Sequence, residues 1–276
     1  MEHLIQDGGT PGIEEFAQEL GETLRSQYGG EAITGLQPFE LLHFRTRCGY
    51  ALRIFKEPDT GMYDAINKGI SRAEGAILAY LNCDEQYLPD TLAVVADFFS
   101  GDAATDVLFG DALLTREDGS LLSYRRVVPP RALHIRLCHL GVWSCAMFYR
   151  RKVAEAGHRF PVEWKAIGDA VFVHGVMHAG FRVAVLPKPL ATFAMGEGNL
   201  GQTPGALAEA RQWRTGMGWR GGLLRPFVKA AHWLEKGFAG AYRRRHVDYA
   251  LYTPLKPGQR SAFVCRNVSW RWKGSR

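Results

Sequence analysis

The sequence has no apolar run of the ~18 residues or more that a membrane-spanning helix needs. Its first twenty residues carry five acidic side chains and therefore do not form a signal peptide. The five cysteines form no Cys-x-x-Cys pair and have no metal-type spacing with histidine, which favours reduced thiols over a disulfide framework or a zinc site. These absences predict a protein that is made and kept in the cytoplasm.

Acidic residues are scarce at the end of the chain. Residues 205–276 contain 15 Lys and Arg but 3 Asp and Glu, a net charge of +12, whereas residues 1–204 have a net charge of −6. No internal repeat or low-complexity segment occurs, and 46% hydrophobic residues in a chain of 276 can bury a core. We therefore expect a globular domain over residues 1–204 and a basic, aromatic, helical appendage over residues 205–276.

Short apolar runs followed by acids indicate the fold class. Residues 76–81 form a continuous apolar run, typical of a fully buried parallel strand, and Asp84 and Glu85 follow where that strand meets water. Further strands are predicted at residues 3–6, 106–111 and 181–186, with helical segments between them. This alternation indicates an α/β fold, a mostly parallel sheet flanked by helices, whose ligands bind at the carboxyl ends of the strands.

A helix is predicted after Asp59-Thr-Gly61. Met62, Ile66 and Ile70 recur every four residues and form one apolar face, while Lys68 lies off that face. Farther along, a loop at residues 158–167 is expected to bring Asp169 to the start of another helix.

Four motifs occur in a fixed order along residues 1–200. They are Asp7-Gly-Gly, Glu57-x-Asp-x-Gly-x-x-x-Ala-x-Asn-x-Gly69, Leu81-Asn-x-Asp84 and Gly168-Asp169. Together they resemble the signature of family 2 glycosyltransferases with the GT-A fold, in the bacterial branch that builds surface polysaccharide. Glu85 stands where that branch has a second Asp, a departure that keeps the charge.

The resemblance implies roles for the acids that come early in the chain. Asp7 and Asp59 would accept hydrogen bonds from the nucleoside of a nucleotide-sugar donor, with charged acceptors giving the stronger bonds. Lys68 would approach the diphosphate. From the residues alone, the favoured role of Asp7 is to close the turn into the first helix, and Lys68 is equally a solvated helix lysine.

A metal ion is the expected cofactor. Departure of a nucleoside diphosphate builds negative charge, so a hard cation held by carboxylate oxygens is needed, and Mg²⁺ or Mn²⁺ takes one or two protein carboxylates. We predict Asp84 and Glu85 as these ligands. The alternative for this pair is a solvated loop after a strand.

The resemblance also assigns roles toward the acceptor to Asp169 and His139. The resemblance makes Asp169 the base that removes the proton of the acceptor hydroxyl, and a direct displacement with one base inverts the anomeric centre. Asp169 also suits a helix N-cap, and the two roles are compatible. His139 would lie near the acceptor, or else would be a structural hydrogen-bonding histidine. Residues 196–199 resemble the glycine-rich flap that closes over the donor, or form a mobile turn.

One departure from the family concerns the start of the chain. Family members have a strand-turn-helix unit of about forty residues before the segment that matches residues 3–9, so we expect the domain to be short at its N-terminus, with an exposed sheet flank. The predicted function is transfer of a sugar from a nucleotide-diphosphate donor, with a UDP-sugar favoured, to a saccharide or lipid-linked acceptor in cell-envelope polysaccharide assembly. The alternative is a non-catalytic nucleotide-sugar-binding or scaffold protein derived from such an enzyme.

The basic appendage adds a prediction about location. Tryptophans interleaved with arginines suit an anionic membrane surface, which predicts a peripheral protein on the inner face of the cell membrane. Packing against the catalytic domain or a partner subunit is the alternative. No nucleic-acid-binding module is recognisable, and the acidic body argues against nucleic acid as a partner.

Overall fold

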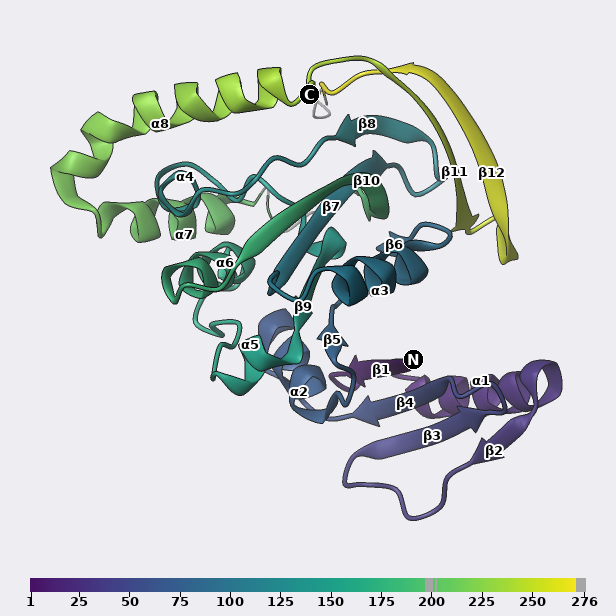
Figure 1. Cartoon of the computed structure of the whole chain (residues 1–276). Coiled ribbons are helices and arrows are strands. Elements are labelled where there is room, and N and C mark those ends of the chain that lie inside the picture. The colour runs from purple at the N-terminus through teal and green to yellow at the C-terminus, as the bar shows by residue number, and fades with distance from the viewer. Residues whose placement is uncertain (197–200, 202, 272–276) are drawn as a thin grey trace. The chain divides into compact units, whose positions relative to one another are not determined.

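The computed structural model describes residues 1–196, 201 and 203–271 (Figure 1). The chain divides into two units. The first consists of residues 1–78 and 159–168, and the second consists of residues 79–158 and 169–276.

The first unit contains a four-stranded sheet with the order β1-β4-β3-β2. Its strands are β1 (Glu2–Asp7), β2 (Gly30–Ala32), β3 (Glu40–Thr46) and β4 (Ala51–Lys56). β1 pairs with β4 in parallel, whereas β3 runs antiparallel to both β4 and β2. Helix α1 (Ile13–Tyr28) contributes Ala17 and Leu24 to a core with Phe44, Leu52 and Ile54 of the sheet.

Helix α2 (Met62–Arg72) confirms the helix predicted from the four-residue apolar spacing, and the short strand β5 (Ile77–Leu78) follows it. Residues 159–168 pack on this helix. The ring of Phe160 stacks on Tyr63 with centroids 5.8 Å apart, and the Asn67 side chain bonds both the N–H and the carbonyl of Phe160. A Cβ on Gly168 would lie 2.5 Å from the Tyr63 ring, so only glycine permits this approach.

The second unit is built around β7 (Val107–Thr115), all nine residues of which are buried. β7 pairs in parallel with β10 (Val183–Ala194) and antiparallel with β8 (Leu121–Arg125) and β9 (Met147–Arg150). β10 also pairs with β6 (Gln86–Tyr87). The helices that precede the appendage are α3 (Thr91–Gly101), α4 (Ala132–Leu137), η1 (Ser144–Ala146), α5 (Arg151–Glu155) and α6 (Gly168–His178).

The α/β class is confirmed, while the strand pairing is more mixed than predicted. Parallel pairing occurs in β1–β4 and β7–β10, and the other pairs described above are antiparallel. The chain passes from β3 to β4, and from β7 to β8, through short connections. Such connections allow only antiparallel neighbours, because a parallel crossover needs a dozen residues or more.

The appendage is helical only in its first part. Helices α7 (Pro204–Thr215) and α8 (Gly218–Phe238) are followed by a hairpin of β11 (Arg245–Thr253) and β12 (Lys256–Val268). The hairpin shares a core with Leu113 of β7 and Tyr124 of β8, and the Tyr249 hydroxyl donates to the Gly119 carbonyl at 2.7 Å. The hairpin therefore packs as the alternative interpretation expected, while the division at residue 204 stays a prediction.

Substitution of Gly110 in β7 tests the close packing of β7 against β10. A Cβ at this position would lie 2.3 Å from Cδ1 of Leu190, a fully buried side chain of β10. We expect Gly110→Val to lower the free energy of unfolding by roughly 2 kcal/mol or more through overpacking. Urea unfolding followed by circular dichroism would measure it.

The matched control is Gly222→Ala in α8. Gly222 is exposed, and its Cβ would meet no atom within 4 Å. Alanine there should be neutral or stabilising by up to about 1 kcal/mol. Equal effects of the two substitutions would contradict the close approach of β7 and β10.

Candidate active-site residues

Asp7 and Asp59, the predicted nucleoside-binding acids, lie on neighbouring loops of the first unit. Asp7 ends β1 and accepts hydrogen bonds from the N–H groups of Gly9 at 2.8 Å and Thr10 at 2.7 Å. Asp59 accepts from the N–H of Gly61 at 2.9 Å. A Cβ on Gly8 would lie 2.5 Å from Asp59 Oδ2, so the two loops touch only because residue 8 is glycine.

The carboxylate of Asp7 is held in its charged form. Burial opposes ionisation, but hydrogen bonds from Thr10 and Gly9 prevail and, with Lys56 nearby, hold the pKa of Asp7 below its usual range. The turn-closing role of Asp7 is thus present in the structure. Contact with a nucleoside stays a prediction for both acids.

Lys68 is engaged within the first unit. Its ammonium group donates to the Pro58 carbonyl at 2.6 Å and to Asp64 Oδ2 at 3.2 Å, and it lies 3.7 Å from a Glu57 oxygen. Lys68 therefore fastens the loop that carries Asp59 to α2. Its predicted contact with a diphosphate stays untested.

Asp84 and Glu85 follow β5 and belong to the second unit. The strand predicted over residues 76–81 is shorter than expected, because β5 spans Ile77–Leu78 and only Leu78 of it is buried. The turn is closed by two bonds, in which the N–H of Glu85 donates to the Asn82 carbonyl at 3.1 Å and the N–H of Asn82 donates to Glu85 Oε2 at 2.9 Å. Asp84 is exposed, whereas Glu85 is buried with 5% of its surface accessible. The second oxygen, Glu85 Oε1, is buried and has no hydrogen-bond partner in the described part of the chain.

Three acids influence one another in the second unit. Burial, together with the negative charges of Asp84 and Asp169, raises the pKa of Glu85 to about 7. Asp169 lies in the first turn of α6, where a negative charge is favourable, and accepts from the N–H of Ala170 at 2.8 Å. The structure thus brings the predicted metal ligands near the predicted base. Asp169 lies within the first turn of α6 and not at the N-cap position that the sequence also suggested.

The Asp84 and Glu85 carboxylates suit a divalent cation by their chemistry. A buried carboxylate oxygen that lacks a partner, beside two further carboxylates, is costly unless a proton or a cation neutralises it. Cys145 and Tyr87 lie near Glu85, and burial raises the pKa of both, so they stay uncharged at neutral pH. Hard cations prefer such oxygen ligands.

His139 lies in a different environment from the acids. Its ring packs edge-on against His134 at 4.7 Å between centroids, and His134 stacks on His232 at 3.8 Å. The sequence singled out His139 alone, because His232 is distant along the chain and no spacing joins it to the other two. Residues 197–200, which include most of the predicted glycine-rich flap, lie outside the described residues.

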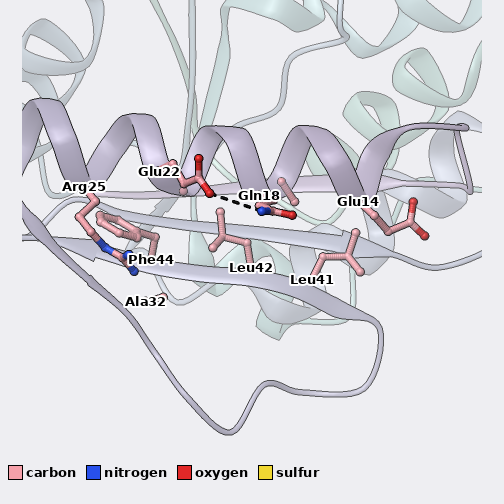
Figure 2. A pocket seen from close by; sticks show the side chains of 10 residues that line it. Glu14, Gln18, Glu22, Arg25, Ala32, Leu41, Leu42 and Phe44 are labelled. Carbon is pink, nitrogen blue, oxygen red and sulfur yellow. Dashed lines mark hydrogen bonds between the residues drawn. The ribbon is translucent and has the colours of Figure 1, made fainter.

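A separate hollow lies between α1 and β3 in the first unit. Figure 2 shows Glu14, Gln18 and Glu22 of α1 above Leu41 and Leu42 of β3, with Gln18 donating to Glu22 at 3.4 Å. None of the residues predicted to bind a donor lines it. We assign it no part in donor binding.

The comparison with protein families decides the classification. Residues 48–155 match the model described as "Glycosyl transferase family 2". This segment belongs to glycosyltransferase family 2. It contains Asp59, Lys68, Asp84 and Glu85, and the resemblance noted in the sequence is confirmed.

The chain has relatives among curated glycosyltransferase sequences. Two proteins named "PGL/p-HBAD biosynthesis glycosyltransferase", from Mycobacterium bovis and Mycobacterium tuberculosis, are 29% identical over 130 residues, which is 46% of this chain and 47% of theirs. The chain thus matches about half the length of these relatives.

Solved glycosyltransferase structures show partial likeness. Staphylococcus aureus TarS, residues 1–349, has a TM-score of 0.49 at 15% identity, covering 94% of this chain and 88% of that one. A mannosyltransferase from Pyrobaculum calidifontis, solved with GDP-Man and Mn²⁺, has a TM-score of 0.44 at 15% identity, with 87% and 70% covered.

The buried Glu85 predicts a pH-dependent stability. Because its pKa is about 7 in the folded protein and 4.5 as the ordinary value, the folded state holds the extra proton between these pH values. Its contribution is therefore fully present below about pH 4.5 and lost as pH rises through 7, by roughly 3 kcal/mol at most in metal-free protein. Glu85→Gln should remove this loss, as measured by urea unfolding between pH 5 and 8.

Asp97→Asn, an exposed acid-to-amide change on α3, is the control and should keep the pH dependence of the unsubstituted protein. If Glu85→Gln and the unsubstituted protein lost stability in parallel as pH rises, Glu85 would not be the group responsible.

Proposed function

We propose that the protein is a glycosyltransferase that moves a sugar from a nucleotide-diphosphate donor, with a UDP-sugar favoured, to a saccharide or lipid-linked acceptor. The observation that carries the proposal is the group formed by Asp84, Glu85 and Asp169, with a buried carboxylate oxygen that lacks a partner in the described residues. Two of these acids lie in the family 2 segment. The proposal includes inversion at the anomeric centre and a role in assembling envelope polysaccharide.

Each predicted residue has a task. Asp7 and Asp59 accept hydrogen bonds from the nucleoside, and Lys68, which holds the Asp59 loop, offers its charge to the diphosphate. Asp84 and Glu85 would hold Mg²⁺ or Mn²⁺, and Asp169 takes the proton of the acceptor hydroxyl. The ion, when bound, supplies positive charge that stabilises the departing diphosphate.

The competing function is a nucleotide-sugar-binding or scaffold protein without catalysis. A transferase and a nucleotide-sugar-binding protein both require donor binding. Only the transferase requires Asp169 to act as a base, so donor binding and donor turnover must be measured separately.

Titration of the full chain with UDP, with and without Mn²⁺, tests the donor site. We expect Mn²⁺ to tighten binding, and Asp84→Ala to weaken the Mn²⁺-dependent binding at least about tenfold, because it removes the exposed ligand. Asp169→Asn should bind UDP normally but release UDP from a panel of UDP-sugars roughly 100- to 10,000-fold more slowly, the usual contribution of a general base.

Asp97→Asn serves again as the matched control and should leave binding and turnover unchanged. Metal-dependent UDP binding without turnover of any UDP-sugar would favour the scaffold function. Binding of GDP in place of UDP would show that the donor carries guanine and not uracil. Binding of neither nucleotide would overturn the proposal.

We also propose that α8 rests on an anionic membrane surface at the inner face of the cell membrane. Its large apolar side chains face outward at helical spacing: Trp219, Leu223, Phe227, Leu234 and Phe238 are 61–90% exposed. Arg220, Arg225 and Lys229 are interleaved with this stripe and are exposed. Aromatic and basic side chains on one exposed helix match the headgroup layer of such a surface. No helix in the described part of the chain is long and apolar enough to cross a membrane.

Vesicle sedimentation tests this proposal. Replacing Trp219, Phe227 and Phe238 by serine should weaken binding to vesicles containing phosphatidylglycerol by at least about 1,000-fold, because each buried aromatic side chain contributes ~1.5–3 kcal/mol. Leu255→Ser is the control, since Leu255 is equally exposed at the hairpin tip. Unchanged binding by the triple variant would rule out α8 as the membrane contact.

A further inference from the structure

Three histidines from separate parts of the chain meet in the second unit. His134 lies on α4, His139 follows that helix, and His232 lies on α8. Ring nitrogens of all three lie within 4.8 Å of one another. Their ring centroids are 3.8 Å apart for His134 and His232, 4.7 Å for His134 and His139, and 6.0 Å for His139 and His232.

The two inner rings lack hydrogen-bond partners. His134 and His232 are buried, with 2% and 4% of their surface accessible. His134 Nε2 and both ring nitrogens of His232 have no partner in the described part of the chain. Buried polar atoms without partners are rare in folded proteins and call for an unseen partner such as a water or an ion.

The backbone beside the rings carries no side chain at Gly141. A Cβ on Gly141 would lie 3.1 Å from Cε1 and 3.3 Å from Nε2 of His232. Any larger residue would press on the nitrogen that a bound ion would use.

We infer that His134, His139 and His232 form a binding site for a transition-metal dication of the Zn²⁺ type, which joins α8 to α4. Imidazole suits Zn²⁺, Co²⁺, Ni²⁺ and Cu²⁺, whereas Mg²⁺ and Ca²⁺ prefer oxygen. The site is therefore chemically distinct from the carboxylates of Asp84 and Glu85. With three protein ligands, the fourth position of a tetrahedral ion is left to water.

Binding requires a small contraction of the cluster. Bonds of ~2.1 Å in a tetrahedral site place ligand nitrogens ~3.4 Å apart, closer than the 4.8 Å limit within which they lie here. His139 is exposed and is the ring with the most freedom to close in.

The charges around the cluster are mixed. Lys236 and Arg125 disfavour an added cation, and Glu235 favours it. Removing the Lys236 charge should therefore strengthen binding.

Metal titration of the chelator-treated full chain tests the inference. We expect one Co²⁺ per chain with the intense visible absorption of a tetrahedral site, and displacement by Zn²⁺. His139→Ala, at the exposed position, should weaken Co²⁺ binding at least about 100-fold, and His232→Gln should do the same while nearly keeping the side-chain size. Lys236→Met should tighten it. Zn²⁺ should raise the melting temperature of the unsubstituted protein by roughly 3 °C or more, but not that of His139→Ala.

His174 and His178 on α6 are the internal comparison, since their rings lie 6.1 Å apart and such a helical pair can also bind metal. Loss of the Co²⁺ spectrum in His174→Ala with retention in His139→Ala and His232→Gln would overturn the inference. So would a Co²⁺ affinity that does not respond to Lys236→Met. UDP is absent from all these titrations, so the result is independent of the proposed transferase activity.

Discussion

The second unit depends on the complete burial of β7. All nine residues of this strand are buried, and it pairs with β10 on one side and with β8 and β9 on the other. β10 in turn pairs with Gln86 and Tyr87, the two residues that follow Glu85. Because this pairing fixes the chain directly after Glu85, its carboxylate is held inside the protein while Asp84 stays at the surface. The sheet thus determines which of the two neighbouring acids is buried.

A second buried acid shows why Glu85 stands out. Asp111 of β7 has no accessible surface, but it accepts hydrogen bonds from Tyr124 at 2.5 Å, from the Val127 N–H at 2.7 Å and from Arg126 at 3.2 Å. Its charge is satisfied by the fold itself, as buried charges normally are. Glu85 has one oxygen bonded to a backbone N–H and the other without a partner in the described residues. An acid buried without full compensation is a feature of functional sites more than of cores.

The sequence predicted elements whose apolar pattern is uninterrupted and missed those with a charge in the core. The spacing of Met62, Ile66 and Ile70 predicted α2, and the apolar run before Asp84 led to the candidate site. Strands β3 and β4 were missed because Glu40 and Arg53 occupy buried positions and break the alternation. Their ion pair at 2.7 Å makes the burial tolerable, but pairing across thirteen residues is not visible in a local pattern. The histidine cluster was missed for the same reason, since His232 lies 93 positions after His139.

Helix α8 exposes its apolar side chains, whereas an ordinary surface helix buries them. Its large apolar side chains face outward, whereas the face that packs on α4 is formed by Gly221 and His232, both buried. A Cβ on Gly221 would lie 3.1 Å from Leu137 of α4, so the two helices approach closely but bury little apolar side chain from α8. Hydrophobic burial is the usual force that holds an amphipathic helix to its domain. In α8 that contribution is small on the inner face, and polar contacts, such as Glu235 accepting from Arg131 at 2.9 Å, must supply more of the attachment. A metal ion shared by His134, His139 and His232 would fasten this inner face, and the apolar stripe would remain available to a membrane surface.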